Sequence, residues 1–378
     1  MKRFSRSSLT TMAVCLLFIP ALLKAQPRPA HRKKVGVVLS GGGAKGMAHI
    51  GVLKVIEKAG IPIDYVVGTS MGSIIGGLYS IGYSPEQLDS MVRRQDWTFL
   101  LSDKIPRSEQ NLSERDASQK YVFSIPFGKG VKAEVFGGLI RGQNLANLFS
   151  ELTIGYHDSI NFNKLPIPFA CVSENIVNGN EVNFHEGVLA TAMRASMAIP
   201  GVFTPVRLDS MVLVDGGVVN NYPVNVARAM GADLIIGVDV QSELKPAGEL
   251  NSAGAILGQL VNLMGQDLYK KNLKETTTYI KVNVEGYSAA SFTPSAIDTL
   301  IMRGEEAAMA QDSALMALKS QLGLDSTYMP QPIPSYPYSP ERKVYVKEIT
   351  FDGLDEKDKK WLLKRCDLKE NSEIIFAG

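Results

Sequence analysis

Cysteine is scarce in this sequence, which limits how the chain can be held together. Three cysteines occur in 378 residues, at Cys15, Cys171 and Cys366. Their wide spacing builds neither a disulfide framework nor a zinc site. The chain is long and apolar enough for a sizeable core, so we expect apolar packing to stabilise the fold.

An excess of charge is also lacking. The formal net charge is +2, and it falls to −2 without residues 1–25, which carry four basic side chains and no acids (Lys2, Arg3, Arg6 and Lys24). Nothing here favours nucleic acid as a partner. The basic start, the apolar run from Met12 to Leu23 and the small residue Ala25 together predict a secretory signal peptide over 1–25.

A nucleophile elbow is predicted at Gly68–Gly72. An apolar run from Tyr65 to Val67, typical of a buried strand, leads into Gly-Thr-Ser-Met-Gly, and a helix of small residues follows over 73–81. Gly-x-Ser-x-Gly between strand and helix places a serine in a strained turn with its hydroxyl exposed, so Gly68 and Gly72 must lack side chains. The alternative is an ordinary tight turn around Ser70.

Histidine is the usual base for a serine nucleophile, but no motif supports a catalytic role for any of the four histidines of the chain. They are His31, His49, His157 and His185. A triad in the order serine, acid, histidine cannot use Asp215, because no histidine follows it. Ser70, Glu174 and His185 satisfy the order, but no motif supports them. We expect His49, on the helix after a glycine loop, to be a structural residue.

Asp215 is the better candidate for the base. It ends the apolar strand 211–214, and Gly216 and Gly217 after it let the backbone turn. The carboxyl ends of parallel strands meet at one edge of a sheet, which would bring Asp215 to Ser70. Because a free aspartate has a pKa of about 3.9, such a dyad needs a direct hydrogen bond and a desolvated pocket. The alternative is a strand-end aspartate in an ordinary turn.

The loop Gly41-Gly42-Gly43-Ala44-Lys45-Gly46 between a strand and a helix has three interpretations. Gly-x-Gly-x-x-Gly fits a dinucleotide site, with Asp64 near the spacing of a ribose-binding acid, although Asp64 precedes its strand. A phosphate-binding P-loop needs Gly-Lys-Ser/Thr, which is absent. The third is an oxyanion hole formed by the N–H groups of Gly42 and Gly43. Lys45 adds positive charge to a lipid phosphate or to the loop, or is simply a solvated lysine.

The pattern along the chain alternates strands and helices, which predicts an α/β fold with parallel strands. Near the C-terminal end, amphipathic helices are expected over 256–272 and 296–322, and alternating apolar and polar residues predict a strand over 344–351. A stretch rich in aromatic residues over 97–138 fits either a lid over an apolar-substrate pocket or packed structure whose hairpins the sequence pattern does not reveal. The expected organisation is a signal peptide (1–25), a leader (26–33), a hydrolase domain (34–322), a proline-rich linker (323–342) and an incomplete unit (343–378), with more chain expected after Gly378.

Taken together, the glycine loop Gly41–Gly46, the elbow Gly68–Gly72 and Asp215-Gly216-Gly217, in this order, resemble the patatin-like phospholipase family. Ala195–Gly201 resembles the family's segment before the aspartate, whereas Val172–Asn175 departs from the Thr-Asp pair common in relatives. The resemblance, over about residues 34–322, implies a three-layer α/β/α fold with a mainly parallel central sheet. It also implies a dyad of Ser70 and Asp215, and hydrolysis of lipid acyl esters without a metal or other cofactor.

The C-terminal segment from Lys343 to Gly353, with the helix after it, resembles the start of a POTRA domain. Patatin-like domains joined to POTRA domains and an outer-membrane barrel form one class of bacterial autotransporter-type proteins. With the signal peptide, this implies a secreted or outer-membrane-associated protein of a Gram-negative cell envelope.

The expected function is therefore that of a metal-independent serine hydrolase of the phospholipase A type. Its partners would be a phospholipid or other acyl-lipid substrate and a membrane surface; a homodimer is left open. The alternatives are a general carboxylesterase or lysophospholipase, and a non-catalytic binding or secretion module of the outer membrane.

Overall fold

The computed structural model describes residues 32–105, 138–251, 253–331, 333, 343–351, 355–364 and 369–375. The predicted signal peptide and most of the leader lie outside these ranges. So do much of the proline-rich linker and residues 106–137 of the aromatic-rich stretch, for which a lid and packed structure are the two alternatives.

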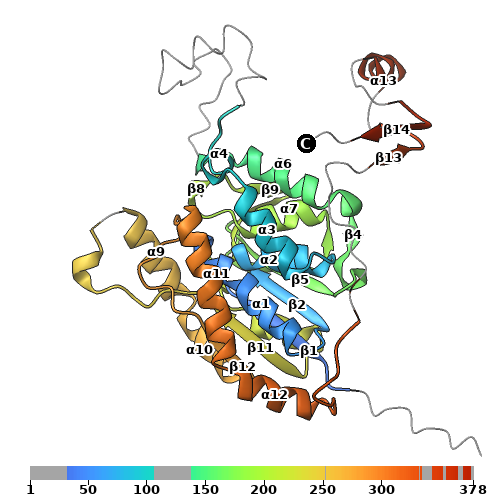
Figure 1. Ribbon diagram of the computed structural model, residues 1–378. Coiled ribbons are helices and arrows are strands. Elements are labelled where there is room, and N and C mark those ends of the chain that lie inside the picture. Colours follow the sequence, from blue (N-terminus) through green and yellow to red (C-terminus); the bar gives the residue numbers. More distant parts are fainter. Residues whose placement is uncertain are drawn as a thin grey trace, which may run out of the picture.

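An eight-stranded, mainly parallel sheet forms the centre of the protein (Figure 1). The order is β12-β11-β1-β2-β5-β10-β9, with β6 also paired to β5. From β12 to β5 the strands are parallel, and β6, β10 and β9 run antiparallel to their neighbours. The strands are β1 (Val35–Leu39), β2 (Tyr65–Thr69), β5 (Phe169–Asn175), β6 (Asn180–Phe184), β9 (Val206–Leu208), β10 (Met211–Asp215), β11 (Leu234–Asp239) and β12 (Thr278–Lys281).

Helices cover both faces of this sheet, because alternate residues of a strand point to opposite sides. Val37 and Leu39 of β1 pack with the larger cluster of helices, whereas Val38 between them packs with α8 and α10 on the other face. The larger cluster includes α1 (Ala48–Lys58), α2 (Met71–Ser80), α3 (Pro85–Arg94), α6 (Gln143–Leu152), α7 (Leu189–Ser196), α11 (Pro294–Met309) and α12 (Asp312–Gln321); the other has α8 (Val224–Ala229) and α10 (Gln266–Lys274). The predicted α/β architecture is confirmed.

The remaining elements complete the described chain. They are α4 (Trp97–Leu100), α9 (Ala253–Met264), α13 (Glu356–Leu363), the 3₁₀ helices η1 (Gly43–Met47), η2 (Ile154–Tyr156), η3 (Phe162–Lys164), η4 (Gly216–Val218) and η5 (Ala247–Glu249), and the paired strands β3 (Gly138–Ile140) with β8 (Gly201–Phe203), β4 (Ile160–Asn161) with β7 (Glu186–Gly187), and β13 (Lys343–Val346) with β14 (Ser372–Ile375). None of the described helices has the length and apolar character that crossing a bilayer requires.

Three expectations about individual elements were wrong. The helix expected over 256–272 is interrupted at Gly265, the N-cap of α10, whose backbone leaves the helical conformation (φ −90°, ψ 5°). The helix expected over 296–322 divides after Met309, where neither glycine nor proline marks a break. The strand expected over 344–351 ends at Val346. The POTRA identity of β13, α13 and β14 stays a prediction.

Two glycines allow α1 and α11 to cross closely above the sheet. A side chain at Gly304 would bring its Cβ within 2.0 Å of the Ala48 carbonyl oxygen, and one at Gly51 within 2.0 Å of the Ile301 carbonyl oxygen. Each helix therefore has a glycine at the point where it meets the backbone of the other.

We expect Gly304→Ala to lower the free energy of unfolding by about 2 kcal/mol, because the helices must separate to admit one methyl group. Gly258→Ala in α9 is the matched control, since its Cβ would meet no atom within 4 Å. There alanine should leave stability unchanged or raise it, by up to about 1 kcal/mol. Urea denaturation of both variants measures the difference, and equal effects would contradict the proposed close crossing.

Candidate active site

Ser70 occupies the turn between β2 and α2 in a conformation that side chains rarely adopt, with φ 54° and ψ −125°. The turn is tight because glycines stand on both sides of it. A Cβ at Gly68 would lie 2.3 Å from the Gly72 carbonyl oxygen, and one at Gly72 would lie 2.2 Å from the Leu39 carbonyl oxygen. The structure thus explains why this motif requires glycine two residues before and two residues after the serine.

A second serine, Ser196 at the end of α7, holds the backbone of this turn. The N–H of Ser70 donates to Ser196 Oγ over 3.0 Å, and the Ser196 hydroxyl donates to the Val172 carbonyl oxygen over 2.6 Å. All of these groups are buried. Sequence reasoning included Ser196 only within the resemblance at 195–201 and assigned it no role.

Asp215 reaches Ser70 because two strands share one edge of β5. On that edge β2 pairs in parallel with residues 169–172, and β10 pairs antiparallel with residues 173–175, while β6 pairs with the opposite edge. The carboxyl ends of β2 and β10 therefore meet head on. The expectation that both residues lie at strand ends holds, but Asp215 arrives on an antiparallel strand and not on a neighbouring parallel one.

The two side chains form a short hydrogen bond: Ser70 Oγ donates to Asp215 Oδ2 over 2.6 Å. The other carboxylate oxygen, Oδ1, accepts from the Gly217 N–H over 2.7 Å, which fixes the carboxylate plane. Burial raises the pKa of Asp215 to about 6, although both hydrogen bonds act to lower it. The structure thus has the direct contact and the desolvation that an aspartate base requires.

The glycine loop packs directly against this pair. The Cβ of a side chain at Gly41 would lie 3.0 Å from Ser70 Cβ, and one at Gly46 would lie 2.4 Å from Met71 Cγ. The Gly41 N–H donates to the Asn221 carbonyl oxygen over 3.2 Å. For the N–H groups of Gly42 and Gly43, by contrast, no acceptor occurs among the described residues. Hydrogen bonds within the described structure therefore do not use these two donors.

Lys45 is not the solvated lysine that one interpretation expected. Its side chain is buried, and Nζ donates to Ser242 Oγ over 2.8 Å. Burial lowers the pKa of Lys45 to about 8, and the nearby Lys281 acts in the same direction. The ammonium group therefore supports the loop from within the protein.

Asp64, the acid considered for a dinucleotide site, has a structural role instead. Its carboxylate accepts from the Val35 N–H over 2.8 Å and forms a salt bridge with Arg32 at 2.6 Å. Strand β2 after it leads into the Ser70 turn. These contacts argue against a ribose-binding role for Asp64.

The histidines of the described chain take no part in this site. His49 is fully buried, its Nε2 lies 2.8 Å from the Ser40 carbonyl oxygen, and burial lowers its pKa to about 4. It is therefore a neutral residue that supports the start of the glycine loop, although its Nδ1 has no partner there. Neither His157 nor His185 hydrogen-bonds Ser70 or Asp215 in the described structure. The alternative order of Ser70, Glu174 and His185 gains no support.

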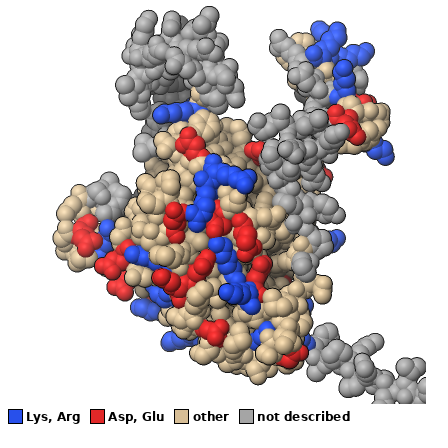
Figure 2. Space-filling model, in the orientation of Figure 1, with Lys and Arg blue, Asp and Glu red and all other residues tan. Residues whose placement is uncertain are grey.

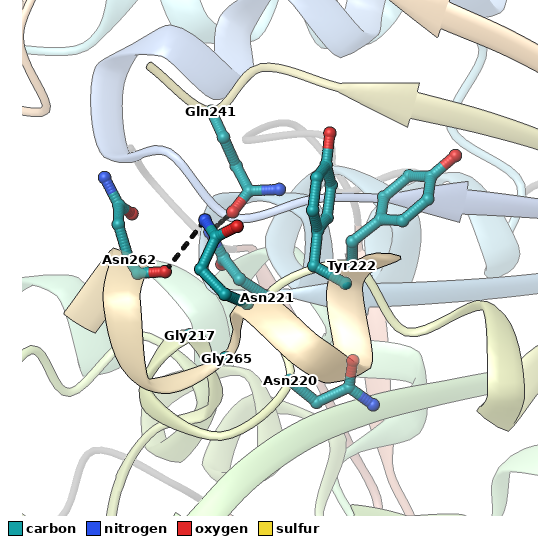
Figure 3. Close-up of a pocket in the computed structure, with 9 residues that line it drawn as sticks. Gly217, Asn220, Asn221, Tyr222, Gln241, Asn262 and Gly265 are labelled. Atoms are coloured by element: carbon teal, nitrogen blue, oxygen red, sulfur yellow. Dashed lines mark hydrogen bonds between the residues drawn. The ribbon is translucent and has the colours of Figure 1, made fainter. Parts of the chain in front are cut away.

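Sequence reasoning missed Asn221, which connects the glycine loop to the Asp215 turn. Its carbonyl binds Gly41, and its side-chain Oδ1 lies 2.9 Å from where a Cβ at Gly217 would stand. Its Nδ2 donates to Gln241 Oε1 over 2.9 Å, and both residues line a small pocket beside the turn (Figure 3). No motif in the sequence marked this asparagine.

Gln241 is held in turn by Asp239, a fully buried carboxylate that sequence reasoning also passed over. Asp239 accepts from the Gln241 N–H over 2.8 Å and from the hydroxyl groups of Tyr269 and Tyr279, and it pairs with Lys281 at 2.9 Å. Its pKa is lowered, since these partners outweigh the cost of burial. Asp239 ends an apolar strand just as Asp215 does, so only the contacts distinguish their roles.

No group of three or more histidine, cysteine, aspartate or glutamate side chains that could hold a metal ion occurs in the described ranges. The site as it stands is a buried serine–aspartate pair beside a glycine loop with two N–H donors that hydrogen-bond none of the described residues. Such an arrangement can activate a hydroxyl and bind a developing oxyanion.

Comparison with known proteins identifies the family. The model of the patatin-like phospholipase family matches residues 37–228, just over half of the chain. The chain belongs to this family. The matched range contains the glycine loop, the Ser70 turn and Asp215, as the resemblance implied.

Several curated proteins are similar to the family domain. Lysophospholipase NTE1 of Candida albicans is 31% identical over 221 residues, which are 57% of this chain and 14% of the relative. Patatin-like phospholipase domain-containing protein 6 of Mus musculus is 32% identical over 211 residues, 55% of this chain and 14% of the relative. An uncharacterised NTE family protein of Mycobacterium tuberculosis is 29% identical over 230 residues, 61% of this chain and 55% of the relative. The match thus spans about half or less of each relative.

Among solved structures, VipD from Legionella pneumophila aligns with a TM-score of 0.44 at 15% identity, over 76% of this chain and 67% of that one. The type III effector protein ExoU aligns with a TM-score of 0.36 at 16% identity, over 76% and 53% of the two chains.

If Asp215 accepts the proton of Ser70, the rate of ester hydrolysis should fall as the pH drops through about 6, because the carboxylate must be ionised to act as a base. A solvated aspartate would place this limb near pH 3.9. A profile of kcat/KM against pH on a soluble ester measures it. A rate that stays constant down to pH 4.5 would contradict the desolvated environment of Asp215.

Ser196→Ala should reduce kcat by about tenfold or more with the fold intact, because it leaves the buried Ser70 N–H without its acceptor. An unsatisfied buried donor costs about 1–3 kcal/mol. Ser80→Ala is the matched control, because this serine is equally buried and its hydroxyl hydrogen-bonds none of the described residues. Equal rates in the two variants would show that Ser196 does not position the nucleophile.

Proposed function

We propose that this protein is a serine lipid acyl hydrolase of the phospholipase A type, with Ser70 as nucleophile and Asp215 as base. The observation that carries the proposal is the 2.6 Å hydrogen bond between Ser70 Oγ and the buried Asp215 carboxylate, neither of which hydrogen-bonds a histidine of the described chain. The family membership and the neighbouring glycine loop support it. The similarity to a relative named as a lysophospholipase favours a lipid substrate.

In the first step, Ser70 Oγ attacks the carbonyl carbon of the ester while its proton passes to Asp215 Oδ2. The N–H groups of Gly42 and Gly43 bind the oxyanion that forms on the carbonyl oxygen. One such donor typically contributes about 2.7–4 kcal/mol of transition-state stabilisation. The bond to the leaving alcohol then breaks, and Asp215 returns the proton to the departing oxygen, which leaves an acyl group on Ser70.

Water completes the reaction. Asp215 takes a proton from the water molecule as its oxygen attacks the acyl carbonyl carbon, and the same two N–H groups bind the second oxyanion. When the bond to Ser70 breaks, the serine oxygen regains the proton from Asp215. The products are a free fatty acid and the remaining lysolipid or alcohol. The residues named here require no metal for any step.

We further propose that the protein acts in a Gram-negative cell envelope, secreted or associated with the outer membrane. The signal-peptide pattern over 1–25 and the resemblance of 343–378 to the start of a POTRA domain support this location.

Fatty-acid release from phosphatidylcholine vesicles by the full chain tests the function. We expect release with and without EDTA, and a loss of about 10³-fold or more in both Ser70→Ala and Asp215→Asn, because each removes a group used in both steps. Asp312→Asn, a substitution in α12 outside the site, should keep the wild-type rate.

Two outcomes would overturn parts of the proposal. Hydrolysis of single-chain lysolipids or soluble esters, with none of vesicles, would favour the lysophospholipase or carboxylesterase alternative. No hydrolysis of any ester and no labelling of Ser70 by a fluorophosphonate would favour the non-catalytic module.

A further inference from the structure

The outer side of helix α9 gathers large apolar side chains in contact with solvent. Exposed apolar residues on α9 and the loop before it, together called the α9 face, are Leu244 (44%), Ile256 (47%), Leu260 (51%), Leu263 (47%) and Met264 (68%). The four on the helix follow the spacing of one helical face. No charged residue occurs from Ala253 to Met264. The other exposed apolar residues of the described chain are spread over several elements.

Hydrogen bonds hold the two parts of the α9 face together. The side chain of Gln259 accepts from the Lys245 N–H over 3.0 Å and donates to the Lys245 carbonyl oxygen over 3.2 Å. Because this pair fixes the backbone of Lys245 to the helix, Leu244 next to it lies beside α9. The apolar residues thus form one continuous structural unit.

The opposite side of α9 rests on the active-site turn. Asn262 and Gly265 line the same small pocket as Gly217 and Asn221 (Figure 3). By helical spacing, Asn262 lies on the far side of α9 from Leu260. The α9 face is therefore directed away from the protein body, while the helix itself contacts the turn that holds Asp215.

We propose that the α9 face docks on a lipid surface, with α9 lying in the interface between headgroups and acyl chains. An uncharged apolar helix face fits this environment. The charges near it are of both signs, since Lys245 forms a salt bridge with Glu249 at 3.6 Å. Docking here would bring lipid to the side of the molecule where Asp215 lies. The role in presenting substrate rests on the proposed function; the binding itself does not.

The area of the α9 face favours a lipid surface over a second copy of the chain. Five half-exposed side chains offer on the order of 300 Å² of apolar surface. A stable dimer buries roughly 800 Å² on each partner. The face over α1, α3 and α11, by contrast, carries intermixed charges of both signs (Figure 2).

A local probe tests the docking. In the full chain with Cys15→Ser and Cys366→Ser, the remaining Cys171 is fully buried, so a cysteine introduced by Leu263→Cys can be labelled with the fluorophore NBD. On vesicles of phosphatidylcholine and phosphatidylglycerol in equal parts, we expect its emission to shift to the blue and to be quenched by brominated acyl chains. NBD at Met302→Cys, 50% exposed on α11, is the matched control and should show neither effect.

Hydrolysis gives the second readout. Leu260→Asp combined with Leu263→Asp should slow the hydrolysis of vesicles at least about tenfold, because the protein loses two leucines that docking would bury in the lipid. Hydrolysis of a soluble ester and fluorophosphonate labelling of Ser70 should not change. The control pair, Met302→Asp with Met309→Asp, should leave all three unchanged.

The outcomes separate the two proposals. If the probe at Leu263 enters the bilayer but the protein hydrolyses no ester, docking is supported and the proposed function is refuted. A Leu263 probe that behaves like the Met302 probe overturns docking. Docking is also overturned if light scattering shows that the wild type is a dimer, and if Leu260→Asp with Leu263→Asp makes it a monomer without slowing the hydrolysis of vesicles.

Discussion

The proposed function depends on one hydrogen bond, between Ser70 Oγ and Asp215 Oδ2 at 2.6 Å. That bond requires two strands to end at the same point from opposite directions. Strand β5 makes this possible by pairing with β2 along its first half and with β10 along its second half, on one edge. The antiparallel end of an otherwise parallel sheet is thus what brings the two side chains together.

Close backbone approach is the second constraint, and glycine satisfies it. Gly41 and Gly46 let the loop after β1 lie against the Ser70 turn, and Gly72 lets α2 begin beside the end of β1. A methyl group at any of these positions would meet atoms at 3.0 Å or less. The glycine loop and the elbow are therefore two halves of one packed unit, which explains why both motifs occur in this chain.

Buried ionisable groups surround this unit in two different ways. Asp239 is buried with enough donors to stay ionised, and through Gln241 and Asn221 it supports the glycine loop. Asp215 has fewer donors, so burial raises its pKa to about 6 and makes it a better base. The same residue type at two strand ends thus acquires opposite properties, because the Lys281 charge and several hydrogen bonds compensate for the burial of Asp239, whereas Asp215 has no cationic partner among the described residues.

Local sequence determined much of this protein. The apolar runs of β1, β2 and β11 and the N-terminal signals of α3 mark these elements directly, and glycine spacing identified the loop, the Ser70 turn and the Asp215 turn. Histidine scarcity already pointed to an aspartate. Tertiary structure alone decided the head-on meeting of β2 and β10, the roles of Ser196, Asn221 and Asp239, the burial of Lys45 and the exposure of the α9 face. These features depend on pairings between residues far apart in the chain, and local propensity and spacing carry no information about such pairings.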